Sequence, residues 1–203
     1  NPLHREVIID RLWPDTADDK ASNRLSVALS TVRRVVHGGE PLGDSPSVIL
    51  ALGDAVRLNL DMIDVDVERF FSYAAAGRQA SADGDDDHAL ALYRLAEESY
   101  GGALYAEDPY CQWAAATRES AALTYGAIVR ELAAADVTAD DHEAASRRYL
   151  RLIEHDPFDE AAHLGAITSL VALGAYGQAH RLHSAYTARM NELGIDPAPF
   201  PAG

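Results

Sequence analysis

The sequence predicts a mainly α-helical protein, in which two helices and a β-hairpin (residues 1–64) precede an all-helical segment (residues 65–203). Apolar residues make up 48% of the 203 residues, enough to bury a core. From residue 66 onward apolar positions recur at helical spacing, and runs typical of strands are absent. Two β-like runs, 47–52 and 55–60, flank Gly53-Asp54, which is a tight hairpin signal.

Two helices are expected before the hairpin. The first covers residues 4–13 and ends before Pro14, whose ring cannot continue a helix. The second starts around Thr16, Asp18 and Asp19, which are residue types that favour helix starts, and runs to about residue 36. Its apolar face is expected to carry Leu25, Leu29, Val32 and Val36. Its opposite face carries Lys20, Asn23, Arg24, Val27, Thr31 and Arg34.

The order helix, helix, hairpin is that of the second part of a winged helix, whose recognition helix enters the major groove of DNA. The candidate DNA-binding residues are then Lys20, Asn23, Arg24, Thr31 and Arg34 on the second helix, and Arg57 on the hairpin wing. Periodicity alone leaves a second interpretation open, in which this face is simply solvated.

The distribution of charge limits where DNA could bind. The net charge is −15, which argues against a general affinity for nucleic acid. Residues 1–36 hold six Lys or Arg against five acidic residues, whereas residues 66–203 hold ten Arg against 22 acidic residues. Any DNA contact is therefore expected in the first segment, and the acidic remainder suits contacts with proteins.

The C-terminal segment predicts helices over 66–80, 85–100, 110–135, 140–155, 159–173 and 175–193. A weak repeat relates Gly84/Ala89/Tyr93, Ala139/Ala144/Arg148 and Gly174/Ala179/His183. The interval of 35 residues from Ala144 to Ala179 is close to the tetratricopeptide (TPR) period, which predicts a TPR-like stack of helical hairpins with a concave binding face. Six aromatic residues could line that face or pack the hairpins, and we expect packing, above all for Trp113: Tyr93, Tyr100, Tyr105, Tyr110, Trp113 and Tyr149.

Several segments occur in the order typical of one family. They are His-Arg-Glu-Val-Ile-Ile-Asp-Arg-Leu-Trp-Pro-Asp (4–15), Asn-Arg-Leu-Ser-Val-Ala-Leu-Ser-Thr-Val-Arg-Arg (23–34), the run from Asp64 to Phe70, and Tyr-Gly-Gly-Ala-Leu-Tyr-Ala-Glu-Asp-Pro-Tyr (100–110) with Trp113 and Arg118. In this order the chain resembles the bacterial transcriptional activator domain (BTAD) family of antibiotic-regulatory (SARP-like) regulators. The resemblance implies a winged-helix DNA-binding domain over 1–64, of which a leading sheet and first helix would precede residue 1, and a BTAD over 65–203 that dimerises or contacts RNA polymerase.

Motifs for other chemistry are weak. Phosphate-binding glycine loops are absent, the acidic run 83–88 lacks the spacing of a calcium loop, and Cys111 has no neighbouring His. His180 and His183 have His-x-x-His spacing, but a zinc site needs further ligands, so we expect two surface histidines. The expectation is a cytoplasmic protein that is not an enzyme and uses no cofactor, metal or membrane.

Two functional hypotheses remain. The first is a transcriptional activator that binds promoter DNA through the winged helix of the parent protein, with RNA polymerase, another protein or a homodimer as its protein contact. The alternative is a TPR-like interaction or regulatory module of a larger protein, without DNA binding.

Overall fold

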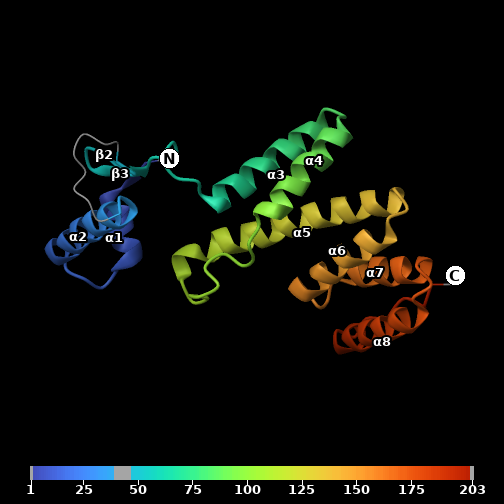
Figure 1. The fold of residues 1–203 in the computed structure, drawn as a ribbon. Helices are drawn as coiled ribbons and strands as arrows, with labels where there is room; N and C mark the ends of the chain where they lie inside the picture. Colours follow the sequence, from blue (N-terminus) through green and yellow to red (C-terminus); the bar gives the residue numbers. More distant parts are fainter. Residues whose placement is uncertain (1, 39–46, 202–203) are drawn as a thin grey trace. The chain divides into compact units, whose positions relative to one another are not determined.

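The computed structural model describes residues 2–38 and 47–201 and has two compact units, Asn1–Val65 and Asp66–Gly203. The fold class is as predicted, because the chain is mainly helical and adds a small antiparallel sheet (Figure 1). Within the described ranges, no helix has the length and apolar character needed to cross a membrane.

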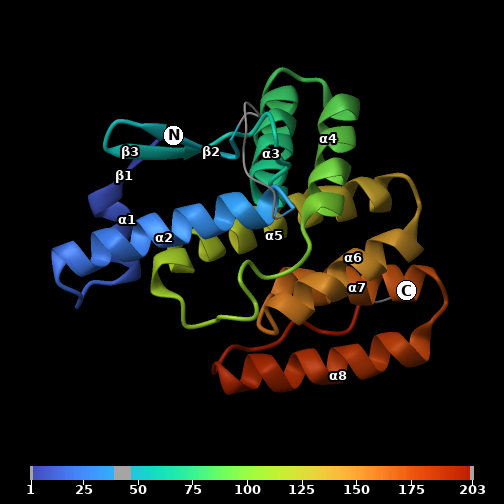
Figure 2. The same cartoon turned by 60° about the vertical axis from the view of Figure 1, so that its left-hand side comes forward.

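The first unit holds two helices and a three-stranded sheet: β1 (Leu3–His4), α1 (Arg5–Leu12), α2 (Asp18–Val36), β2 (Ile49–Leu52) and β3 (Ala55–Leu58). The sheet order is β1-β3-β2, and both pairs are antiparallel (Figure 2). The predicted hairpin pairs Leu52 with Ala55, and its Gly53 has φ 61°, a left-handed conformation that favours glycine. The strand β1 was not predicted, because two residues are too short to show a period.

The core of this unit is formed by Val48, Ile49 and Val56, against which Leu29 of α2 packs. Helix α2 also buries Ala21 and Leu25. The predicted apolar face is wrong in its second half, because Val32 and Val36 are 43% and 49% exposed. The reason is length: α2 has 19 residues and spans ~28 Å, whereas β2 and β3 have four residues each and span only ~13 Å.

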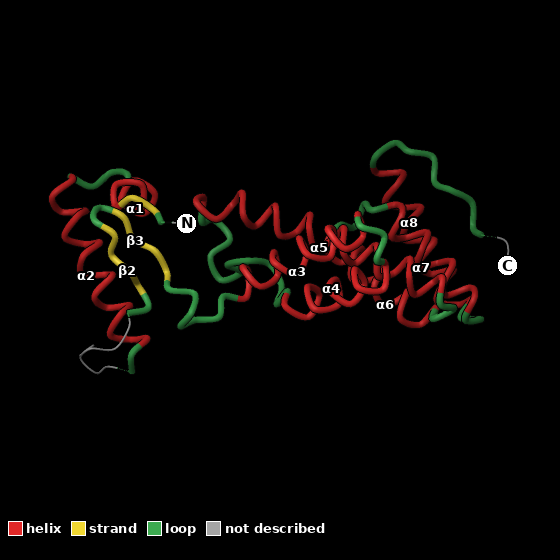
Figure 3. The backbone as a smooth tube through the Cα atoms, turned by 90° about the horizontal axis from the view of Figure 1, so that it is seen from above, coloured by secondary structure: helices red, strands yellow, loops and turns green. Residues whose placement is uncertain are grey.

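The second unit contains six α-helices and one 3₁₀ turn: α3 (Asp66–Ala82), α4 (Asp86–Ser99), η1 (Gln112–Ala114), α5 (Ala115–Thr138), α6 (His142–His155), α7 (Glu160–Ala172) and α8 (Tyr176–Glu192). Each α-helix packs on the next one along the chain, and no strand occurs within residues 66–201 (Figure 3). Three helices start at an aspartate whose side chain accepts a hydrogen bond from the backbone N–H three residues later: Asp85, Asp141 and Asp159.

A left-handed residue before α4, α6 and α8 sets the repeat of the helical unit. These residues are Gly84, Asp140 and Gly174, with φ of 81°, 61° and 72°. The predicted repeat was one residue out of register in its middle copy, because Asp140 takes the conformation that glycine supplies in the other two. The buried alanines five residues later are Ala89, Ala145 and Ala179. The last interval is then 34 residues, which is the tetratricopeptide period.

Two tyrosines nine residues after the left-handed position pack on glycines of neighbouring helices. A Cβ added at Gly77 would lie 2.5 Å from the ring of Tyr93, and one added at Gly165 would lie 2.5 Å from the ring of Tyr149. Both glycines are therefore required for close helix packing. The corresponding position in α8 is His183.

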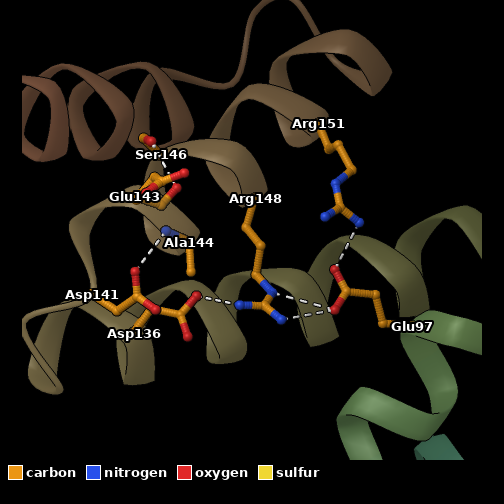
Figure 4. A network of polar contacts seen from close by, with 8 residues as sticks. All are labelled: Glu97, Asp136, Asp141, Glu143, Ala144, Ser146, Arg148 and Arg151. Carbon is orange, nitrogen blue, oxygen red and sulfur yellow. Dashed lines mark hydrogen bonds and ion pairs between the residues drawn. The ribbon is translucent and has the colours of Figure 1, made fainter.

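A network of charged side chains joins α4, α5 and α6 (Figure 4). Arg148 pairs with Glu97 at 3.0 Å and also with Asp136, while Arg151 pairs with Glu97 at 2.9 Å. The side chains of Arg148, Glu97 and Asp136 are only 14%, 10% and 11% exposed. Burial alone would lower the pKa of Arg148, but hydrogen bonds from it to Glu97 and Asp136, together with their charges, raise that pKa above its ordinary value.

Candidate nucleic-acid interface

The candidate interface is the side of α2 that faces away from the core of the first unit. Asn23, Val27 and Arg34 are exposed, and at 100° per residue they fall within roughly 40° of one another. Lys20 and Thr31 are exposed on the same side of the helix. The five helical candidates, including Arg24, are thus all accessible to a ligand, and we call the stripe from Lys20 to Arg34 the α2 surface.

Val27 belongs to this surface, although it is not among the predicted site residues. Its side chain is 58% exposed between Asn23 and Arg34. An exposed apolar side chain on a recognition helix can contact the methyl group of thymine. The sequence signal for it was present, because valine is unusual on an otherwise polar helix face.

Three arginines of the first unit donate hydrogen bonds to other residues of that unit. Arg5 donates a hydrogen bond to Ser26 Oγ at 2.8 Å, and Arg33 donates one to the carbonyl oxygen of Ile49 at 3.2 Å. These two arginines join α1 and β2 to α2. Arg24 lies at the edge of the α2 surface, where it donates to Thr16 Oγ1 at 3.2 Å, so Thr16 holds an arginine and does not cap the helix.

Arg57 lies on β3 opposite Leu50, and its side chain is exposed. Successive side chains of a strand point to opposite faces of the sheet. Since Val56 packs into the core beneath the sheet with Leu29, Arg57 lies on the outer face. The fold therefore brings the five helical candidates together and does not bring Arg57 onto the α2 surface.

The first turn of α2 borders an acidic groove. The groove is lined by His4, Arg5, Glu6, Ile9, Asp10, Asp18, Asp19, Ser22 and Asp54. Asp18 and Asp19 stabilise the start of the helix, whose backbone N–H groups carry partial positive charge. The same carboxylates repel phosphate, so the part of the α2 surface best suited to an anion runs from Asn23 to Arg34.

The prediction for Trp113 is wrong. Trp113 was expected in the core, but it is 43% exposed and packs edge-on against the ring of Tyr105 at 4.8 Å. Its position in the short turn η1, outside the helix pairs, explains the exposure.

His183 is half-buried and His180 is exposed. Among the described residues, no group of three or more His, Cys, Asp or Glu side chains is placed to hold a metal ion.

Comparisons with known proteins place this arrangement in a family. The comparison with curated proteins gives no match. Among solved structures, Mycobacterium tuberculosis EmbR in complex with a low-affinity phosphopeptide is similar, with a TM-score of 0.66 and 22% identity over 98% of this chain and 52% of that chain. This chain thus spans about half the length of that one, and the likeness shows the fold. The model of the bacterial transcriptional activator domain matches residues 65–200. The chain belongs to the bacterial transcriptional activator domain family.

Proposed function

We propose that the protein is a DNA-binding transcriptional activator that uses α2 as the recognition helix of a winged helix. The observation that carries the proposal is the α2 surface, where Lys20, Asn23, Arg24, Thr31 and Arg34 are all exposed on the longest helix of the first unit. The hairpin β2–β3 would be the wing. Family membership supports a role in transcription regulation and does not point to an enzyme.

The residues of the α2 surface would divide the work of recognition. Arg24 and Asn23, nearer the helix start, would contact base edges, because recognition helices enter the major groove with their N-terminal part. Arg34, near the helix end, would contact a phosphate. Arg57 would contact phosphate only if DNA reached the outer face of the sheet.

The helical unit would supply the protein contact, which is RNA polymerase, another protein or a second copy of the chain. Its 22 acidic residues against ten Arg make it unsuited to DNA and suited to basic protein surfaces. One observation favours the alternative of an interaction module without DNA binding. The loop before α5 presents Tyr110 90% exposed, while Arg118 holds the loop through the carbonyl oxygens of Leu104, Asp108 and Pro109 at 2.8, 3.1 and 2.9 Å. Exposed aromatics on a fixed loop are typical of binding hot spots.

The test measures DNA affinity against salt for the full-length regulator, on a sequence that it selects from random oligonucleotides. Arg34→Ala should weaken binding to all sequences and reduce the salt slope by about one unit. Arg11→Ala is the matched control, because Arg11 is an exposed arginine in the last turn of α1, as Arg34 is in the last turn of α2. Arg24→Ala should relax base preference at one position by about 1–3 kcal/mol.

Two outcomes decide between the hypotheses. If Arg34→Ala changes the slope and Arg11→Ala does not, α2 lies against DNA. If Arg24→Ala and Arg34→Ala both fold and bind DNA as the parent does, the recognition-helix assignment is wrong and the interaction module replaces it.

A further inference from the structure

The segment after α8 turns back and runs alongside that helix (Figures 2 and 3). Both backbone groups of one of its residues are bound. The N–H of Ala198 donates to the hydroxyl oxygen of Tyr186 at 2.8 Å, and Nε2 of His183 donates to the carbonyl oxygen of Ala198 at 3.0 Å. Tyr186 and His183 of α8 therefore bind the backbone of the segment at Ala198.

An aromatic side chain of the segment is held next to this point. The ring of Phe200 stacks on His180 with centroids 4.1 Å apart and planes 7° apart. It also meets His183 edge-on, at 5.4 Å and 78°. The His-x-x-His pair thus forms two sides of a site for an aromatic ring, and His183 serves both the ring and the main chain.

The hydroxyl of Tyr186 is oriented from the neighbouring helix. Tyr186 is fully buried and donates to Glu160 of α7 at 2.5 Å. With its proton committed to the carboxylate, the phenolic oxygen can only accept, which suits an incoming backbone N–H. Glu160 of α7 therefore orients the group of α8 that accepts from the segment.

The sequence of the bound segment restricts the backbone conformations that it can adopt. In Asp-Pro-Ala-Pro-Phe-Pro (196–201) every residue is a proline or precedes one. Proline fixes its own φ, and the residue before a proline is restricted to extended or polyproline II backbone. Such a segment loses little conformational entropy when it binds, and this is the property that proline-recognition modules use.

The site lies at the position of α8 that corresponds to a helix-packing tyrosine in α4 and α6. His183 corresponds to Tyr93 and Tyr149. Tyr93 packs on Gly77 of the preceding helix α3, whereas Tyr149 packs on Gly165 of the following helix α7, and only the second arrangement would place a further helix against His183. In α8 the corresponding side chain contacts the segment 196–201 instead. Within the described residues, this end of the stack is covered by an extended peptide and not by a helix.

We propose that the α7–α8 face is a recognition site for a proline-flanked aromatic segment in polyproline II conformation, and that residues 196–201 occupy it in cis. A partner protein that presents a segment of the same kind, with an aromatic residue between prolines, binds the site by displacing the chain's own segment. This proposal does not depend on DNA binding by α2.

The experiment replaces residues 196–201 in the full chain by a Gly/Ser segment of equal length and adds a fluorescent Asp-Pro-Ala-Pro-Phe-Pro peptide. Fluorescence anisotropy should show saturable binding to the replaced chain. Binding to the parent should be at least about tenfold weaker, because the tethered segment competes at a millimolar effective concentration. A peptide with alanine in place of phenylalanine should lose at least about tenfold in affinity.

A point variant locates the site. In the replaced chain, His180→Ala should lower the affinity for the peptide by roughly tenfold, since it removes the ring on which the phenylalanine stacks. Arg181→Ala, at the neighbouring exposed position, should bind as the replaced chain does. Equal peptide binding to the parent and replaced chains, or no binding to a folded replaced chain, overturns the proposal.

Folding is monitored separately by far-UV circular dichroism. If the replaced chain fails to fold, Phe200→Ala in the otherwise intact chain is used instead. That variant should stay folded and bind the peptide more tightly than the parent. If it also unfolds, the segment is part of the core and the proposal is wrong.

Discussion

Arg148→Ala should destabilise the protein by about 3–5 kcal/mol, the range found when one partner of a buried ion pair is removed. The guanidinium lies between Glu97 and Asp136, whose side chains are 10% and 11% exposed. After the substitution, Arg151 still pairs with Glu97, but Asp136 loses the partner that its ion pair with Arg148 supplies. The cost is therefore dominated by one largely buried carboxylate that loses its cation.

The matched control is Arg147→Ala, one residue earlier on α6. Arg147 pairs with Glu143 at 2.5 Å, but the two side chains are 57% and 74% exposed. Water screens this i,i+4 pair, so its loss should cost only about 0.3–0.5 kcal/mol. The two variants remove the same group from the same helix and differ chiefly in burial.

The measurement is urea unfolding at neutral pH, followed by far-UV circular dichroism and analysed by linear extrapolation. A second substitution, Asp136→Asn, is combined with Arg148→Ala in a double-mutant cycle. Because the two groups touch, their coupling energy should exceed about 1 kcal/mol. The reasoning is refuted if Arg148→Ala and Arg147→Ala differ by less than about 1 kcal/mol, or if the coupling energy is near zero.

Three further predictions concern packing and titration. Gly165→Ala should lower the free energy of unfolding in urea by about 1–3 kcal/mol, because the new Cβ meets the ring of Tyr149. The control Gly177→Ala, whose Cβ has its nearest atom at 3.7 Å, should be neutral or stabilising by up to about 1 kcal/mol. Trp113→Ala should cost less than about 1.5 kcal/mol, since the side chain is 43% exposed, and a loss typical of core aromatics would contradict its placement in η1. Burial, with the hydrogen bond to Glu160, raises the pKa of Tyr186 above its ordinary 10.0, so the unfolded state ionises first. Stability should be intact below about pH 10 and fall as pH rises above it, and a urea midpoint that stays constant there would contradict this.

Most helices could be predicted from the sequence because their signals are local. Asp85, Asp141 and Asp159 each stand just before a helix and cap it, and proline or glycine follows several helix ends. The register of the repeat could not be predicted, because Asp140 performs a glycine's role. Aspartate adopts the left-handed conformation only occasionally, so residue type alone did not single out Asp140.

The sequence predicts which side chains of α2 face solvent on the α2 surface, but it does not predict which apolar side chains on the opposite face are buried. Exposure of Asn23 and Arg34 follows from helical periodicity, since they lie opposite Leu25. Exposure of Val32 and Val36 depends on how far the short sheet extends along α2, which periodicity does not contain. The prediction that Trp113 lies in the core is wrong for a related reason, since burial of an aromatic residue depends on the tertiary contacts around it.

The small number of cations on the α2 surface constrains how the protein would bind DNA. In the part of the chain that the structure describes, that surface carries three: Lys20, Arg24 and Arg34. Even if all three contacted phosphates, the salt slope would reach only about −2.7, smaller in magnitude than that of a protein making six or more contacts. The net charge of −15 opposes binding at long range and adds no general attraction. One copy of this surface therefore has little electrostatic affinity to offer. If it binds a promoter as proposed, tight binding would require base contacts by Asn23, Arg24 and Val27, a second copy on an adjacent half-site, or both.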